Sequence, residues 1–135
     1  MDGYWFTSEK FLVEPGEDDE VNPGRYGRQL ANWLKAELER LGYNVEPVIA
    51  EDWGRCLMLS RDPFMLWVGC GNVVDLDAAV QSTSSVTWHC FPAAEVSLFK
   101  RLFGKADTST ALSKLDADLH AILAAEPAVQ LVAEP

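Results

Sequence analysis

The sequence predicts an α+β fold, with a mostly antiparallel four- to five-stranded sheet and helices packed on one face. Three observations lead to this prediction. Strand-like segments dominate residues 4–91, an amphipathic helix interrupts them early, and two helical segments follow them. The predicted order is β-α-β-β-β-β-α-α, and a run of strands flanked by helices is typical of α+β proteins. With 135 residues, 48% of them hydrophobic, the chain is long enough for one domain with its own core.

The first strand and the first helix are expected in residues 4–41. Residues 4–13 are rich in aromatic and β-branched side chains, which favours a strand. An acidic loop follows, and a helix is predicted over 23–41, with Asn22 as its cap and Pro23 in its first turn. Its apolar residues recur at spacings of three and four and form one stripe: Tyr26, Leu30, Trp33, Leu34, Leu38 and Leu41. Gly42 is expected to end the helix.

The next segments predict the body of the sheet. Residues 43–50 read as an edge strand because Pro47 cannot donate to a ladder. Residues 55–60 and 64–70 are expected to form a hairpin, and 85–91 another strand. Alternation places Leu66, Val68 and Cys70 on one face of the second hairpin strand and Met65 and Trp67 on the other. Residues 73–84 fit either a loop or a short helix.

Two helices are expected to complete the fold. Pro92 would begin the first and Gly104 would end it, while Asp107 or Thr108 would cap the second, which runs to about residue 124. Pro127 would break that helix. We therefore expect a single domain over residues 1–126 and a loose C-terminal tail over 127–135.

Charge restricts the classes of partner. The chain has 21 acidic and 11 basic residues, a formal net charge of −10. This balance argues against nucleic acids and anionic membranes, which require clustered Lys and Arg, but it suits a basic protein. The N-terminus lacks the basic and apolar regions of a signal peptide, and the longest apolar runs are far shorter than the roughly 20 residues of a membrane span. We expect a cytoplasmic protein.

No catalytic or metal-binding motif stands out, and we expect no cofactor. His89 and Cys90 are neighbours in a strand and point to opposite faces, and the two histidines and three cysteines lack zinc-site spacing. There is no Gly-x-Ser-x-Gly element. The cysteines are expected to be buried and reduced. Cys70, between two glycines, is the alternative candidate for an exposed thiol.

Two basic residues near the start of the first helix suggest an anion site. Arg25 and Arg28 would lie in the first turn, where the helix dipole disfavours cations. The acidic run at 17–20 could compensate them within the protein. Otherwise Arg25, Tyr26 and Arg28 would hold an anion between the first helix and the sheet.

Two tryptophans suggest a protein-binding surface. Trp53 lies in the charged turn Glu51-Asp52-Trp53-Gly54, and Trp67 lies on the sheet face that the helices leave uncovered. Exposed tryptophan beside carboxylates is typical of binding hot spots. The alternative is that Trp53 folds back over the sheet edge. The predicted protein-binding residues are Glu51, Asp52, Trp53, Trp67, Asp75 and Asp77.

Part of the chain resembles a known group of proteins. The pattern Asn22-Pro-Gly-x-Tyr-Gly-x-x-Leu-Ala-x-Trp-Leu34, followed by Glu51-Asp-Trp-Gly54, resembles small uncharacterised bacterial single-domain proteins. In size, acidity and aromatic content the chain is also similar to bacterial toxin-immunity proteins, which neutralise toxins by binding them. That second similarity implies a binding role and assigns no site residue.

The leading hypothesis is a non-catalytic acidic module that binds a basic protein, such as a toxin. The alternative is a small-molecule (anion) binding protein or enzyme with a pocket between the first helix and the sheet. A closed pocket lined by Arg25, Trp53 and Cys70 would favour the alternative, whereas a flat acidic face would favour protein binding. A homodimer that covers the open sheet face is the third possibility.

Overall fold

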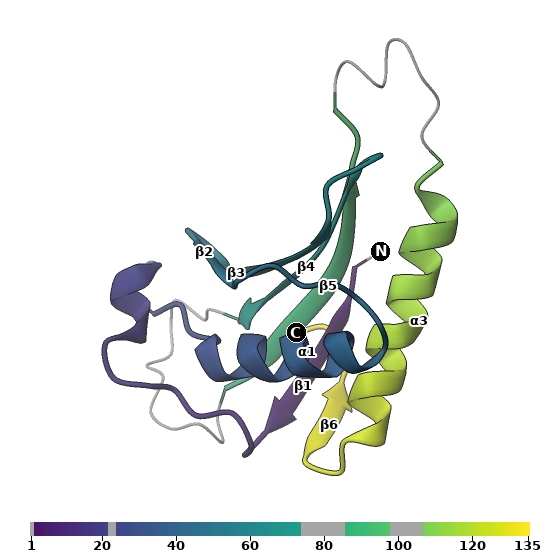
Figure 1. The fold of residues 1–135 in the computed structure, drawn as a ribbon. Coiled ribbons are helices and arrows are strands. Elements are labelled where there is room, and N and C mark those ends of the chain that lie inside the picture. The colour runs from purple at the N-terminus through teal and green to yellow at the C-terminus, as the bar shows by residue number, and fades with distance from the viewer. Residues whose placement is uncertain (1, 22–23, 74–85, 98–106) are drawn as a thin grey trace.

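The fold, taken from a computed structural model, is built on a sheet of six antiparallel strands in the order β2-β3-β4-β5-β1-β6 (Figure 1). The structure describes residues 2–21, 24–73, 86–97 and 107–135. Its strands are β1 (Tyr4–Ser8), β2 (Ile49–Glu51), β3 (Gly54–Ser60), β4 (Met65–Asn72), β5 (Trp88–Glu95) and β6 (Val129–Val132). Its helices are the short 3-10 helix η1 (Glu17–Glu20), α1 (Arg28–Arg40) and α3 (Ser109–Ala125). The α+β class and the antiparallel sheet are confirmed.

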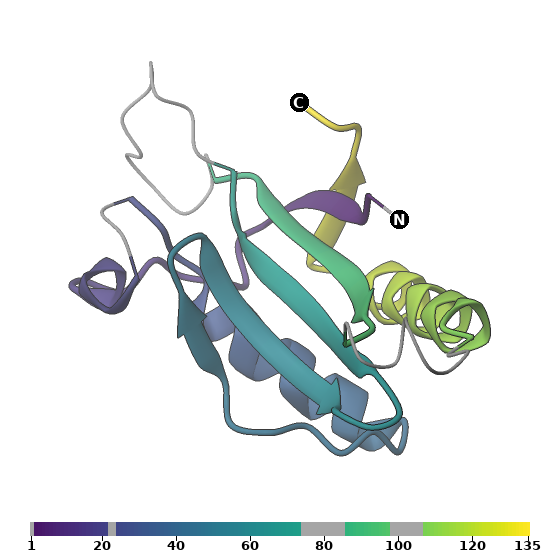
Figure 2. The same cartoon turned by 90° about the horizontal axis from the view of Figure 1, so that it is seen from above.

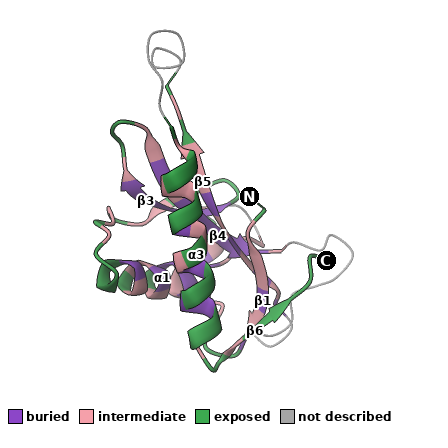
Figure 3. Ribbon diagram, turned by 90° about the vertical axis from the view of Figure 1, so that its right-hand side faces the viewer, coloured by how far each residue is buried: buried purple, intermediate pink, exposed green. Residues whose placement is uncertain are grey.

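Both long helices pack on one face of the sheet (Figures 1 and 2). Helix α1 lies against β3 and β4, and α3 lies against β5 and β6. Alternate strand residues meet them and are buried, and Phe11 links α1 to the sheet through ring contacts with Trp33 and Trp88. The core residues include Phe6, Leu30, Leu34, Leu38, Leu57, Val68, Trp88, Leu115, Leu119 and Leu123, all fully buried. Figure 3 shows the resulting contrast between the buried and the exposed sides of α3.

The apolar patterns located most of these elements. The β3–β4 hairpin pairs Leu57 with Val68 and Met58 with Trp67. On β4, Leu66, Val68 and Cys70 are buried against the helices, whereas Trp67 remains half-exposed on the other face. Helix α3 begins after Thr108, as expected, and the Asp107 carboxylate accepts hydrogen bonds from the Ser109 N–H and hydroxyl.

The first helix starts later than predicted. It begins at Arg28 rather than 23, because Gly24 and Gly27 adopt positive φ angles of 81° and 141°. Such backbone is outside the helical region and favours glycine. Arg25 therefore precedes the helix instead of occupying its first turn. The expected cap, Asn22-Pro23, lies outside the described residues.

Two strands were missed or shortened in the prediction. Residues 127–135 are not a loose tail, because β6 pairs with β1 along Val129–Val132. Residues 92–95 belong to β5 rather than to a helix. Pro92 is tolerated there because β1 pairs with β5 only at residues 88–90, so one side of β5 has no partner strand at Pro92. The remainder of the predicted helix, 98–104, and residues 74–84 lie outside the described part of the chain.

Two other strands, β1 and β2, are shorter than the sequence indicated. β1 ends at Ser8, and Phe11 then turns into the core. Of the predicted strand 43–50, only residues 49 and 50 pair regularly, in β2, which extends to Glu51; the Glu46 N–H also donates to the Met58 carbonyl. The six observed strands thus replace the four to five that were predicted.

Candidate functional site

An aromatic cluster occupies the sheet face that the helices leave uncovered. It consists of Trp5, Trp53, Trp67, His89 and Phe91, and we call it the aromatic band. The His89 ring stacks on Trp5 at 4.4 Å and on Phe91 at 5.2 Å. Phe91 in turn lies 5.7 Å from Trp53 and 5.6 Å from Trp67, and the two indoles are 5.8 Å apart. Strands β1, β4 and β5 and the β2–β3 turn thus contribute to one continuous ring surface.

Gly69 makes room for this band. It pairs with Phe91 across β4 and β5. A Cβ at Gly69 would stand 2.4 Å from the Phe91 ring and 2.9 Å from the Trp53 ring. Those distances are shorter than van der Waals contact, so any larger residue would push the rings away from the sheet. Trp53 therefore folds back over the sheet, as one of its two predicted placements required, and still remains 36% exposed.

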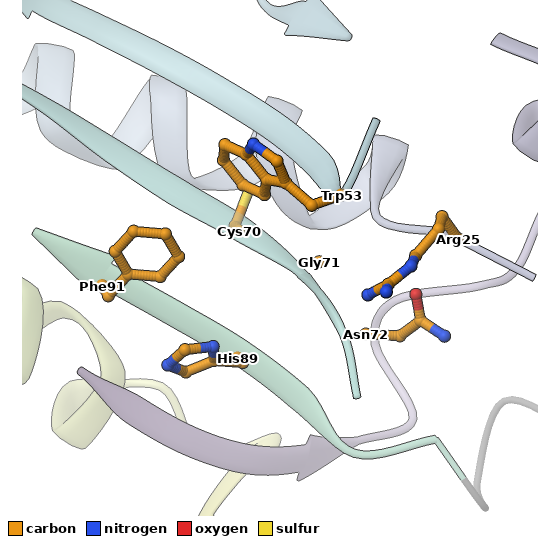
Figure 4. Close-up of a pocket in the computed structure, with 7 residues that line it drawn as sticks. All are labelled: Arg25, Trp53, Cys70, Gly71, Asn72, His89 and Phe91. Atoms are coloured by element: carbon orange, nitrogen blue, oxygen red, sulfur yellow. The ribbon is translucent and has the colours of Figure 1, made fainter. Parts of the chain in front are cut away.

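A hollow of about 230 Å³ opens beside the band. Figure 4 shows Gly71 at its base, with Trp53, Phe91 and His89 on one side and Arg25 and Asn72 on the other. Cys70 completes its lining. The hollow is open to solvent on one side rather than closed. It thus combines an aromatic wall with one cationic group.

The position of Arg25 is fixed by its backbone neighbours. The Asn72 side chain is 5% exposed and spans Arg25: its Oδ1 accepts a hydrogen bond from the Tyr26 N–H at 2.8 Å, and its Nδ2 donates to the Gly24 carbonyl at 2.9 Å. The Asp18 carboxylate accepts a further bond from the Gly24 N–H. Both peptide groups that flank Arg25 are therefore held by Asn72 at the end of β4, and the Gly24 N–H is held by η1.

Glu17 secures the same segment from inside the protein. Its side chain is fully buried, and its carboxylate accepts hydrogen bonds from the backbone N–H groups of Glu14, Gly27 and Arg28 at 2.7, 2.7 and 3.2 Å. The buried Arg55 guanidinium donates to the Glu17 carbonyl. Glu17 of the acidic run therefore offsets the positive end of the helix dipole from within the protein, but its carboxylate binds these backbone N–H groups rather than the Arg25 side chain that the run was expected to compensate.

The three residues of the predicted anion site do not share one pocket. Arg25 lines the hollow, but the Arg28 guanidinium lies 3.3 Å from the Glu14 carboxylate. Tyr26 contributes its backbone to the Asn72 contact, and its side chain is half-buried, which raises the pKa of its hydroxyl. The N–H groups of Gly27 and Arg28 are already used by Glu17. The helix N-terminus therefore offers no free site at these two groups.

Arg25 differs from two other arginines, Arg28 and Arg61. It is half-buried, and it has no hydrogen bond or ion pair within the described residues. Arg28 pairs with Glu14, and Arg61 pairs with Glu46 through contacts of 2.7 and 3.0 Å. Among the described residues, no carboxylate pairs with this guanidinium.

One ring nitrogen of His89, Nε2, is held by a backbone carbonyl beside the hollow. Its Nε2 lies 2.8 Å from the Asp2 carbonyl oxygen, an acceptor, so Nε2 is the donor in this contact. Stacking on Trp5 and Phe91 fixes the ring plane. Nδ1 makes no hydrogen bond to the part of the chain that the structure describes. His89, Arg25 and Asn72 are the polar side chains among the described residues that line the hollow.

The predicted protein-binding residues are only partly brought together. Glu51 and Asp52 are exposed and precede Trp53 in the β2–β3 turn, and Trp53 contacts Trp67. Asp75 and Asp77 lie outside the described residues. Acidic groups and indoles therefore meet at one corner of the uncovered sheet face.

The cysteines are buried thiols, as predicted. Cys70 is 1% exposed, and burial raises its pKa to about 12. Cys56 is also buried, with its pKa raised by burial to about 11, and burial raises the pKa of Cys90 well above the usual value. The alternative of an exposed Cys70 is wrong, and the thiol is not a nucleophile near neutral pH.

Among the residues that the structure describes, no three His, Cys, Asp or Glu side chains gather into a group that could hold a metal ion. Within the same residues, neither long helix is sufficiently long and apolar to cross a membrane.

Sequence reasoning missed His89, Phe91, Asn72 and Gly71 as members of the hollow. They come together through the pairing of Gly71 with His89 and of Gly69 with Phe91 between β4 and β5. The alternation of residues 64–70 was the one available signal, because extending it to Gly71 places that residue on the face of Trp67.

No family model, curated protein or solved structure matches the chain.

Proposed function

We propose that the protein binds a small anionic molecule in the hollow beside Trp53. The observation that carries this proposal is the Arg25 guanidinium, which is half-buried in the hollow and has no counter-ion within the described residues. A cation removed from water is costly unless it is paired, and an anion that enters the hollow would supply the missing partner.

The surrounding contacts support a binding role for Arg25. Three side chains fix the backbone from Gly24 to Arg28: Asn72, Asp18 and Glu17. Binding would therefore cost little conformational freedom in this segment. The hollow has the three lining residues that were expected of an anion pocket, Arg25, Trp53 and Cys70, but it is open rather than closed, and it lies on the uncovered sheet face rather than between the first helix and the sheet. The shared lining supports the small-molecule hypothesis, whereas the open shape does not.

The test is an NMR titration of the ¹⁵N-labelled protein with acetate, benzoate and inorganic phosphate. Binding in the hollow should shift the Arg25 Nε–Hε signal and the Gly71 amide. Arg25→Gln should weaken binding about tenfold or more, because hydrogen bonds to a charged group contribute roughly 1.5–3 kcal/mol. Arg28→Gln is the matched control, since it removes the same charge three residues away and should leave binding unchanged. If no anion gives a shift that depends on Arg25, the proposal fails.

A second candidate is the docking of a basic protein, such as a toxin, on the aromatic and acidic corner of the sheet. The observation that favours it is the contact between Trp53 and Trp67 on an uncovered face, with Glu51 and Asp52 exposed beside them. Rigid indoles next to carboxylates suit a cationic partner, because charge speeds the encounter and the rings supply buried area.

Affinity capture from the source cells separates this candidate from anion binding. Wild-type protein should retain a basic protein at low salt and release it at high salt. A Glu51→Gln/Asp52→Asn variant, which keeps both indoles, should retain much less of it. Equal capture by both proteins, or retention that salt does not affect, would remove the candidate.

A further inference from the structure

We infer that the anion held by Arg25 is an aromatic carboxylate: a flat ring bearing a single carboxyl group. The inference rests on the proposed function and narrows it from any small anion to one chemical class. Four features of the hollow support it: its single cationic group, its aromatic wall, the glycine at its base and its volume.

The charge of the hollow suits a monoanion. Among the described residues that line the hollow, Arg25 is the one formally charged group, and Asn72 is committed on both sides to backbone partners. A guanidinium presents its N–H groups in a planar fork that matches the two oxygens of a carboxylate. A phosphate dianion would require a second cation or free helix N–H groups. Glu17 occupies the N–H groups of Gly27 and Arg28.

The wall across from Arg25 suits an aromatic ring. Trp53 and Phe91 pack at 5.7 Å with a tilt of 44°, and His89 extends the same surface. Figure 4 shows these three rings on the side of the hollow opposite the guanidinium. Aromatic rings prefer offset or edge contacts with one another and gain about 0.5–1.5 kcal/mol beyond their buried area in such pairs. A ligand ring would continue the aromatic band toward Arg25.

The base of the hollow suits a flat body. Gly71 lies at its centre, between the rings and Arg25 (Figure 4), and it carries no side chain. A ligand ring could therefore approach the β4 backbone closely. The volume of about 230 Å³ is below the roughly 300–1,000 Å³ of sites for drug-sized ligands. A ring of benzoate size fits this volume.

The test compares three probes on the wild-type protein: benzoate, cyclohexanecarboxylate and benzamide. Cyclohexanecarboxylate keeps the charge but loses the flat ring, and benzamide keeps the ring but loses the charge. We expect benzoate to bind about three- to tenfold more tightly than cyclohexanecarboxylate, the range that an aromatic contact supplies. Benzamide should bind at least about tenfold more weakly than benzoate. The readout is the dissociation constant from NMR titration at the Gly71 amide.

A substitution at the base of the hollow locates the ring. In Gly71→Ala the new Cβ would lie 3.5–3.6 Å from its nearest atoms, which is ordinary contact, so the fold should be retained. The methyl group would occupy the surface on which the ring rests, and benzoate should bind about tenfold more weakly. Thermal melting of the variant verifies that the fold persists.

The outcomes separate the two levels of the proposal. If benzoate and cyclohexanecarboxylate bind equally well, or if only phosphate binds through Arg25, the aromatic class is wrong while anion binding stands. If no anion produces a shift that depends on Arg25, both fail. Unchanged benzoate affinity in folded Gly71→Ala would overturn the placement of the ring, and with it the argument for a flat ligand.

Discussion

Replacing Glu17 tests whether a single buried carboxylate holds the segment that carries Arg25. In Glu17→Gln, the amide oxygen can still accept from the Gly27 and Arg28 N–H groups, but the amide nitrogen would face the Glu14 N–H, a donor against a donor. The variant loses one short charge-assisted bond and weakens two others. Because hydrogen bonds to charged groups contribute roughly 1.5–3 kcal/mol each, we expect a loss of about 2–3 kcal/mol.

Glu17→Ala should cost more, about 4–5 kcal/mol, because one buried and two partly buried N–H groups lose their acceptor and a cavity is left. Urea denaturation measures both losses as changes in the free energy of unfolding. For a domain of this size, each 1 kcal/mol corresponds to a fall in Tm of roughly 3–5 °C, so thermal melting gives a second measure.

Asp19→Asn is the matched control for Glu17. Asp19 lies in the same short helix but is exposed, so its substitution should change stability by no more than about 0.5 kcal/mol. If Glu17→Gln is as stable as Asp19→Asn, the carboxylate does not hold the segment and our account of how Arg25 is positioned is wrong.

Three further predictions concern the rest of the fold. The thiols of Cys56, Cys70 and Cys90 should resist a disulfide reagent at pH 8 and react only in denaturant, because burial raises their pKa values; one rapidly reacting thiol in the native protein would contradict this. Burial alone would raise the pKa of Asp118, but hydrogen bonds from Lys114 and Tyr43 outweigh burial and lower it. The Asp118 carboxylate therefore stabilises the fold above its unfolded-state pKa, and this stabilisation is lost as pH falls. Asp118→Asn should be destabilised by about 1 kcal/mol at pH 7, and in urea titrations it should lose less stability than the wild type between pH 6 and pH 3. An identical pH dependence of the two proteins would refute this prediction. Deleting residues 128–135 removes β6 from the edge of β1 and should lower the urea midpoint, whereas an unchanged midpoint would show that β6 is not docked.

Apolar periodicity located the elements whose burial depends on their own sequence. The stripe through Leu30, Leu34 and Leu38 lies in the core, and so do Leu66 and Val68 on alternate positions of β4. In these segments the burial pattern and the local propensity agree, so the sequence alone was sufficient to place them.

Long-range contacts account for the elements that the sequence misplaced. The start of α1 depends on Asn72 and Glu17, which bind the backbone before the helix from 46 and 10 residues away. Local cap signals at Asn22-Pro23 carry no information about those contacts. β6 likewise forms only because β1 offers an edge that lies far away along the chain.

The same distinction applies to the site. Arg25 and Trp53 were identified because a cation expected in the first turn of a helix and an indole in a charged turn are unusual in themselves, although the structure places Arg25 before the helix. His89 and Phe91 looked ordinary, since a strand residue reveals its neighbours only after the strand order is known. Pairing of β4 with β5 is what places both beside Gly71.

A crystal structure of the protein with bound benzoate tests the central claim most directly. We predict that the two carboxylate oxygens lie within hydrogen-bonding distance of the Arg25 guanidinium and that the ring rests over Gly71 against Trp53 and Phe91. Benzoate bound at another surface, with only solvent beside Arg25, would contradict the account.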